Sequence, residues 1–165
     1  MFEAALAATI LTNCAITNIH DGDTLTAWCP GEGKVKVRLH CIDTPELAQK
    51  PWGIEARDHL RALAGRGPVR IVAIEQDRYG RTVGDVIRGR TVLNLKMVAD
   101  GQAAVYRRYC DDPRYFQAET QARRRKIGIW SRRGLHQKPW EWRRRHRRER
   151  RSERNWWSFF RDLLK

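Results

Sequence analysis

The chain has 165 residues, 41% of them hydrophobic and 32% charged, and a formal net charge of +14. This length suits one domain with a modest core and excludes two full domains. No apolar run approaches the roughly 20 residues that span a bilayer, so the sequence predicts no transmembrane segment. The charge is concentrated at one end: residues 132–165 hold 13 Lys+Arg and 4 Asp+Glu, a net charge of +9. Such an excess attracts phosphate polymers or anionic lipid.

A β-hairpin is predicted near the N-terminus. Residues 15–20 and 24–28 are short β-prone runs, and an Asp-Gly turn separates them. If the hairpin turns at Asp21 and Gly22, paired positions sum to 43, and Cys14 would face Cys29. These two cysteines could form a cross-strand disulfide, or they could be two small, partly buried thiols.

The other two cysteines, Cys41 and Cys110, are interpreted as space-filling residues without a partner. None of the four cysteines has CxxC spacing, which disfavours a zinc site.

The remaining elements follow in an order typical of one fold. Residues 35–42 alternate apolar and basic side chains, as a half-buried strand does. Further strands are predicted at 69–74 and 82–87, and helices at 54–64, 92–100 and 114–127. Five strands with a helix after the third, then C-terminal helices, indicate an α+β protein built on a five-stranded OB-fold barrel.

Both ends of the chain differ from this middle part in composition. Residues 1–13 are interpreted as an N-terminal arm or a signal remnant, because Glu3 stands where a signal peptide carries positive charge. The barrel domain is placed at 14–131, and 132–165 form a basic extension. Its arginine-rich part, 143–154, could be a solvated helix or a disordered arm.

The end of the extension reads as an amphipathic helix. Trp156, Phe159, Phe160 and Leu163 would share one helical face. Together with the arginines, this face leaves three readings open. The extension could be a nucleic-acid arm, a packing or oligomer contact, or an element that lies on an anionic membrane.

Acidic residues at two predicted strand ends point to a metal site. Asp23 begins the second strand and Asp43 ends the third, and in a small barrel these ends can lie side by side. Two carboxylates with a backbone carbonyl and water suit Ca²⁺ or Mg²⁺. Glu46 would point into the same cleft, where it could orient or deprotonate water. Each of these acids, taken alone, could equally be an ordinary residue of a turn or of the protein surface.

Two arginines accompany these acids. Arg38 lies on the strand that leads to Asp43, and Arg81 lies in a Tyr-Gly-Arg turn. Two planar guanidinium groups can hold a phosphate from two sides and stabilise charge that develops in the transition state. Each arginine alone would more often be a structural or solvated residue.

From about residue 15 to residue 131, the chain resembles the staphylococcal nuclease (thermonuclease) family. The matching blocks are DGDT at 21–24, RLHCIDTPE at 38–46, DRYGR at 77–81, VLNLKMVADG at 92–101 and AETQARRRKIGIWS at 118–131. They occur in the family's order, with a shortened loop after Glu46. The resemblance implies an OB-fold and a calcium-dependent nuclease acting on DNA and RNA, with Mg²⁺ or Mn²⁺ as substitutes for Ca²⁺.

The resemblance also implies roles for individual residues. Asp23, Asp43 and the backbone carbonyl of Thr44 match calcium ligands, and Asp21 matches an acid outside the direct ligands. Glu46 matches the residue that activates water, and Arg38 and Arg81 match the phosphate-binding arginines. The substrate-binding positions correspond to Arg78, Tyr79, Tyr106 and Arg107. Arg107 stands where the family's type member has a stacking tyrosine.

The expected reaction breaks the P–O5′ bond and leaves a 3′-phosphate. The alternative is a catalytically silent nucleic-acid or protein binding module, which typically loses the catalytic residues that are complete here. Calcium dependence and a Cys14–Cys29 disulfide would suit an exported protein, but no convincing signal peptide supports export. A monomer is the expected oligomeric state.

Overall fold

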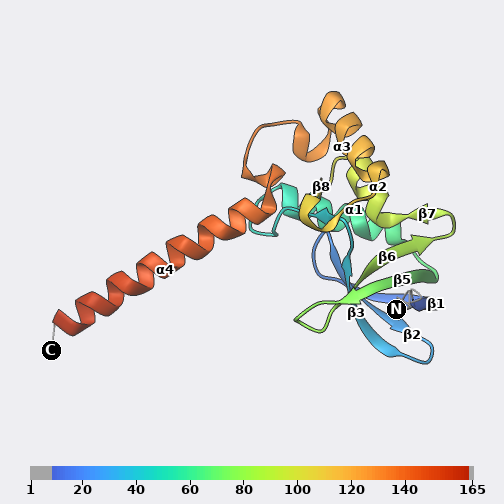
Figure 1. Ribbon diagram of the computed structural model, residues 1–165, viewed down its shortest axis with the longest axis horizontal. Coiled ribbons are helices and arrows are strands. Elements are labelled where there is room, and N and C mark those ends of the chain that lie inside the picture. The colour runs from blue at the N-terminus through green and yellow to red at the C-terminus, as the bar shows by residue number, and fades with distance from the viewer. Residues whose placement is uncertain (1–8, 164–165) are drawn as a thin grey trace, which may run out of the picture.

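A computed structural model describes residues 9–163 of the chain, with side chains described as far as Arg151. Five strands form a closed barrel (Figure 1). They are β1 (Thr9–Ile19), β2 (Thr24–Cys29), β3 (Gly33–Leu39), β5 (Val69–Gln76) and β6 (Thr82–Arg88). Neighbouring strands follow the order β3-β2-β1-β5-β6, and a parallel pairing of β3 with β6 closes the barrel. The predicted α+β class and OB-fold barrel are confirmed.

The N-terminal hairpin has the predicted register. Ala15 pairs with Trp28 and Ile16 with Ala27, before a bulge shifts the pairing nearer the turn. Cys14 and Cys29 form a disulfide, which confirms the cross-strand pairing. Strand β1 also begins earlier than expected, because Thr9 already pairs with Ala73 of β5.

The prediction that Cys41 and Cys110 are unpaired is wrong, because they form a second disulfide. Short strand β4 (Ile42–Asp43) pairs with β8 (Ala104–Val105), and Tyr106 donates a backbone hydrogen bond to the carbonyl of Cys41. This long-range pairing brings the segment after β8 against the residue before β4. Cys41 and Cys110 are 69 residues apart, and no local pattern in the sequence signals their contact.

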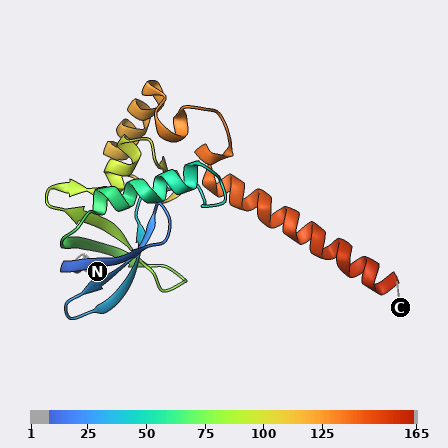
Figure 2. The ribbon, with the colours of Figure 1, turned by 180° about the vertical axis from the view of Figure 1, so that it is seen from behind.

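Helices cover one side of the barrel (Figures 1 and 2). They are α1 (Trp52–Ala64), α2 (Leu93–Ala99), which follows the short strand β7 (Thr91–Val92), and α3 (Pro113–Arg125). Three short 3₁₀ turns complete this part: η1 (Arg107–Tyr109), η2 (Gly128–Trp130) and η3 (Leu135–Gln137). Asn94 anchors α2, since its buried amide bonds the backbone of Val86, Gly84 and His40.

The basic extension is helical from Pro139 to Leu163, so residues 143–154 form a helix rather than a disordered arm. Helix α4 (Pro139–Leu163) starts against the body of the molecule and then projects away from it (Figures 1 and 2). At its base, Trp140 packs on a small cluster that includes Ile129 and Trp130. The side chains of the proposed apolar face, Trp156 to Leu163, lie outside the described residues. Within the described range, no helix is long and apolar enough to cross a membrane.

Candidate active site

Two buried aspartates meet where β2 begins and β4 ends. Asp43 is fully buried and Asp23 is 6% exposed. The Asp23 carboxylate accepts hydrogen bonds at 2.9 Å from both the backbone N–H and the hydroxyl of Thr44. These bonds tie the turn before β2 to the end of β4. The structure thus brings the two predicted metal ligands and Thr44 together.

Arg38 joins the two aspartates. It lies opposite Thr24 in the β2–β3 register, so its side chain leaves the barrel at the same end as Asp23. Its Nη1 lies 2.9 Å from Oδ2 of Asp23, and its Nη2 lies 2.9 Å from Oδ1 of Asp43. One guanidinium group therefore fixes the separation of the two carboxylates.

The acids are held in an unfavourable electrostatic setting. Burial and then the negative charge of Asp23 raise the pKa of Asp21 to about 7. Burial and the same neighbour raise the pKa of Asp43 to about 6, although Arg38 and Arg143 oppose the shift. Carboxylates that repel one another in a buried setting favour binding of a proton or a cation.

The donor set fits a hard cation. The acidic side chains offer carboxylate oxygens as ligands, which a hard cation prefers. The site has no cysteine thiolate, because Cys41 is in a disulfide. Among the described residues, no three acidic, histidine or cysteine side chains converge on one point. The two acids that could hold a cation are Asp23 and Asp43, with a backbone carbonyl and water as the other ligands.

A compact turn positions Glu46. Its backbone N–H donates to the side chain of Gln49 at 2.9 Å, and its carbonyl accepts from the backbone N–H of Gln49 at 2.8 Å. Helix α1 begins directly behind this turn. Gly53 lies so close that a Cβ there would come within 2.0 Å of the Glu46 carbonyl oxygen. The approach of α1 thus fixes the backbone of Glu46.

Arg81 and Tyr79 reach the site from the loop between β5 and β6. Asp77 holds this loop, because its carboxylate accepts backbone bonds from Tyr79 and Arg81 and pairs with Nε of Arg81 at 2.7 Å. The guanidinium groups of Arg78 and Arg81 lie over the ring of Tyr79. The tyrosine is 68% exposed.

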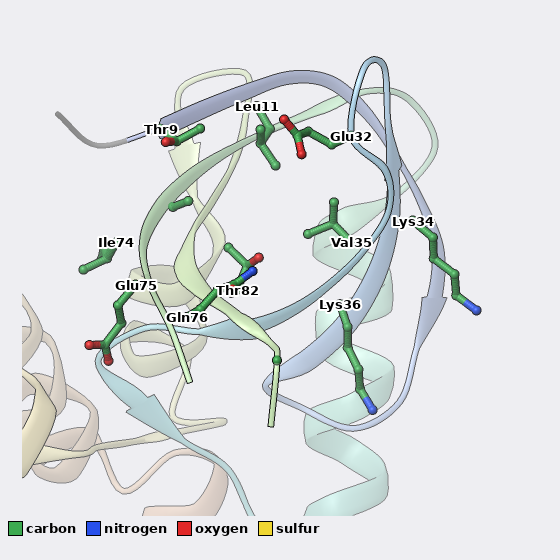
Figure 3. Close-up of a pocket in the computed structure, with 12 residues that line it drawn as sticks. Thr9, Leu11, Glu32, Lys34, Val35, Lys36, Ile74, Glu75, Gln76 and Thr82 are labelled. Carbon is green, nitrogen blue, oxygen red and sulfur yellow. The ribbon is translucent and has the colours of Figure 1, made fainter. Parts of the chain in front are cut away.

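Most of these residues line one cleft of about 790 Å³, but the buried Asp43 and Thr44 are not among its lining residues. Among the predicted site residues, the cleft is lined by Asp21, Asp23, Arg38, Glu46, Arg78, Tyr79, Arg81 and Tyr106. A hollow of about 670 Å³ also opens at the barrel, bounded by β1, β3, β5 and β6 (Figure 3). Its two acids, Glu32 and Glu75, lie on opposite sides of that hollow (Figure 3). It holds no comparable set of acids and arginines.

Comparison with known proteins agrees with this geometry. The model of the family described as staphylococcal nuclease homologue matches residues 36–132. The chain belongs to this family. It is 39% identical over 118 residues to an uncharacterized endonuclease of Haemophilus influenzae, covering 72% of this chain and 66% of that protein. It is 39% identical over 140 residues to a micrococcal nuclease of Shigella flexneri, covering 78% of this chain and 79% of that protein.

A third relative is a probable staphylococcal-like nuclease of Oryza sativa, 35% identical over 117 residues. That match covers 71% of this chain but only 31% of the rice protein. The chain therefore spans about a third of the rice relative and about two thirds of the Haemophilus protein. Relatives named as nucleases support a nuclease function in general terms, and a nucleic acid as its substrate.

One predicted substrate contact is not brought into the cleft of this staphylococcal nuclease homologue. Arg107 points towards α3, where its guanidinium pairs with the buried Glu119 at 3.1 Å and lies over the ring of Phe116. Tyr106 does line the cleft, with its ring stacked on Trp140 at a centroid distance of 5.5 Å. The exposed Tyr109 also lines it.

Sequence reasoning missed a residue of the site that comes from α4. Arg143 Nη1 lies 2.7 Å from Oε1 of Glu46, and its Nη2 lies 2.7 Å from Oδ2 of Asp43. Both Arg143 and Arg147 line the cleft. The arginine run was visible in the sequence, but nothing in it distinguished these two from their neighbours.

Proposed function

We propose that this staphylococcal nuclease homologue is a metal-dependent nuclease that hydrolyses phosphodiester bonds in DNA, RNA or both. The observation that carries the proposal is the shared cleft. Asp23 and Glu46 supply negative charge there, Asp43 is buried against the cleft residue Arg38, and Arg38 and Arg81 supply donors for a phosphate. Acids alone would repel a nucleic acid, and arginines alone would only bind it. Their combination suits phosphodiester cleavage.

The cation would be Ca²⁺, with Mg²⁺ or Mn²⁺ as substitutes. Asp23, Asp43 and the carbonyl of Thr44 would hold it, and Asp21 would add negative charge nearby. When bound, it would supply charge neutralisation at the scissile phosphate. The hydrogen bonds from Thr44 to Asp23 keep this carboxylate in place without a metal.

The remaining steps belong to side chains of the chain itself. Glu46 is half-exposed at the cleft, where it can orient water and accept its proton for in-line attack on phosphorus. Arg38 and Arg81 would bind the phosphate oxygens and stabilise the charge of the phosphorane. The P–O5′ bond then breaks and the leaving oxygen takes a proton from solvent, so one product carries a 3′-phosphate and the other a 5′-hydroxyl.

Aromatic and basic residues at the rim would bind the rest of the substrate. The exposed ring of Tyr79 and the neighbouring Arg78 stand beside Arg81, suited to a terminal phosphate. Tyr106 and Tyr109 offer rings at another part of the rim. Rings of this kind can stack on bases of any identity.

The proposal is tested by incubating the purified protein with single- and double-stranded DNA and RNA. Each substrate is supplied with Ca²⁺, Mg²⁺, Mn²⁺ or EDTA, and the product ends are identified by mass. We expect cleavage with Ca²⁺, none with EDTA, and 3′-phosphate ends. If no substrate is cut under any metal condition, the alternative of a silent binding module replaces the nuclease.

A further inference from the structure

Helix α4 takes part in the walls of the cleft. Arg143 and Arg147 are four residues apart, so they lie one above the other on the same helical face. Both line the cleft, together with Arg108 and the loop residues Arg78 and Arg81. In a helix that is merely exposed to solvent, the arginine side chains would extend into water and would not line a cleft. Here the arginines of one face are aligned with the acids and arginines of the barrel.

The base of α4 is fixed relative to this cleft. Trp140, in the first turn, stacks on Tyr106 with an interplanar angle of 7°. Tyr106 is itself joined to β4 through its backbone bond to Cys41. Arg143, in the second turn, reaches Asp43 and Glu46. Two adjacent turns of α4 are therefore attached to the site, which sets the direction in which the helix leaves it.

Basic charge continues along the helix beyond the cleft. Between Arg143 and Arg151 there are seven arginines and one acid, Glu149, which pairs with Arg145 at 3.0 Å. Arg150 and Arg151 are exposed and lie one turn beyond Arg147. The face of Arg143, Arg147, Arg150 and Arg151, named here the α4 arginine face, therefore begins at Asp43 and Glu46 and continues along the helix. The ribbon of α4 projects away from the barrel (Figure 1).

We propose that the α4 arginine face beyond Arg143, whose guanidinium is already paired with Asp43 and Glu46, binds the phosphates of the nucleic-acid strand on one side of the scissile bond. The strand enters the cleft between α4 and the β5–β6 loop and extends along the helix. This inference rests on the proposed nuclease function, and it deepens that function by specifying the substrate. Strands long enough to reach Arg150 and Arg151 are preferred over short ones, because each added phosphate contact releases counterions.

The test compares two variants that remove the same charge. The first carries Arg147→Ala, Arg150→Ala and Arg151→Ala. The matched control carries Arg124→Ala, Arg125→Ala and Arg133→Ala, which are exposed arginines outside the cleft and the α4 arginine face. Binding to fluorescent single strands of about 4 and about 24 nucleotides is measured in EDTA over a series of salt concentrations. Circular dichroism checks that both variants keep their helix content.

For the long strand, log K falls as log salt rises. The first variant makes this fall shallower, reducing the magnitude of the slope by about 2, since each single-strand phosphate contact contributes about 0.7. The control variant changes the slope by much less. The loss of affinity grows with strand length in the first variant alone. In a cleavage assay with metal, the first variant loses at least tenfold in kcat/KM for the long strand relative to the short one.

Equal slopes in the two variants would overturn the inference. A second result would also overturn it. If the first variant kept the slope of the unmodified protein on nucleic acid but lost binding to anionic phospholipid vesicles, α4 would be a membrane-surface element. Binding is measured in EDTA and needs no turnover. Failure of the inference is therefore distinct from failure of the proposed function, which would appear as absent cleavage by the unmodified protein.

Discussion

Nη2 of Arg143 lies 2.7 Å from Oδ2 of Asp43, a fully buried carboxylate, while Arg143 itself lines the cleft. Nη1 of the same group lies 3.1 Å from the other oxygen of Asp43. Hydrogen bonds and the charges of Asp43 and Glu46 raise the pKa of Arg143, although its burial opposes the shift. A side chain that is always charged thus binds the carboxylate proposed to hold a metal, so the guanidinium and the metal would compete for Asp43.

Replacing Arg143 by alanine should therefore tighten binding of the cation. The variant removes a positive charge from the carboxylates, and we expect a dissociation constant for Ca²⁺ that is roughly tenfold lower, or about 1.4 kcal/mol. Titration calorimetry at pH 8 measures it, because the carboxyl groups with pKa values of about 6 and 7 are ionised there.

Arg144→Ala is the matched control, since Arg144 is an exposed neighbour on the same helix. It removes the same charge without touching the acids, and should change the affinity little. Weaker Ca²⁺ binding in Arg143→Ala than in the unmodified protein would show that Arg143 orders the acids rather than competes for them.

Turnover should depend on Glu46 and Arg81. Glu46→Gln removes the group that accepts the proton from water, and Arg81→Ala removes a donor to the phosphorane. Losses of about 10² to 10⁴ in kcat are typical for such groups. Steady-state cleavage of a labelled DNA strand measures them, and urea unfolding confirms that the fold is kept.

Glu75→Gln is a control for Glu46→Gln, because Glu75 also lines the cleft but is exposed and lies on β5. We expect its kcat to stay within about threefold of the unmodified protein. Unmodified kcat in both Glu46→Gln and Arg81→Ala would remove these residues from the proposed chemistry.

Much of the site could be predicted because its residues are adjacent to recognisable turns. Asp23 follows an Asp-Gly turn, and Asp43 precedes a Thr-Pro pair that ends a strand. Local signals of this kind locate strand ends, and a small barrel brings strand ends together. The pairing of Cys14 with Cys29 followed from the same logic, because a tight hairpin turn fixes the register.

Features that depend on distant contacts could not be predicted in this way. Arg143 is 100 residues from Asp43 along the chain. It belongs to a run of seven arginines between 143 and 151, and the sequence alone does not show which of them reaches the site. Cys41 meets Cys110 only because β4 pairs with β8, two strands of two residues each. Arg107 pairs with the buried Glu119 on α3, which also accepts from the backbone N–H of Val105 and pairs with Arg123. None of these contacts leaves a periodic pattern in the sequence.

Gly53 should be required for the position of Glu46. A methyl group there would overlap the Glu46 carbonyl, so Gly53→Ala must push the turn away from α1. We expect loss of at least tenfold in kcat and destabilisation of about 1–3 kcal/mol, as for other overpacked positions. Cleavage assays and urea unfolding measure the two effects.

Gly89→Ala serves as the comparison for Gly53→Ala. Gly89 has a positive φ, yet a Cβ there meets no atom within 4 Å. It should lower stability through backbone strain while leaving kcat unchanged. If Gly53→Ala keeps full kcat, the close approach of α1 does not determine where Glu46 lies.

The Cys41–Cys110 disulfide should stabilise the protein and the cleft together. It closes a loop of 69 residues, against 15 for Cys14–Cys29. In the chain-entropy model the longer loop contributes more, within a typical range of about 2–4 kcal/mol. The double serine variant at Cys41 and Cys110 should therefore unfold at lower urea than the double serine variant at Cys14 and Cys29.

Activity separates the two disulfides further. Cys41 lines the cleft and lies two residues before Asp43, whereas Cys14 and Cys29 lie in the hairpin. Below the unfolding transition, only the Cys41 and Cys110 variant should lose kcat. Equal losses in both variants would mean that the disulfides act through global stability alone.

Asp85 should make stability depend on pH in a defined direction. This carboxylate on β6 accepts from the Asn94 amide at 3.1 Å and lies 3.9 Å from Nδ1 of His40. Burial raises its pKa above the usual value of 3.8, although His40, Tyr115 and Arg114 oppose the shift. The folded state therefore binds this proton more tightly than the unfolded state does.

The stability that follows is fully present below about pH 4 and is lost as the pH rises through the raised pKa of Asp85. Asp85→Asn has no such proton. The free energy of unfolding of the unmodified protein, minus that of Asp85→Asn, should fall as the pH rises above about 4 and level off above the raised pKa of Asp85. Urea unfolding of both proteins at several pH values measures this difference. Distant carboxyl groups titrate alike in the two proteins, so their contributions to the difference largely cancel. A difference that rises with pH would mean that the charged form of Asp85 is the one the fold stabilises.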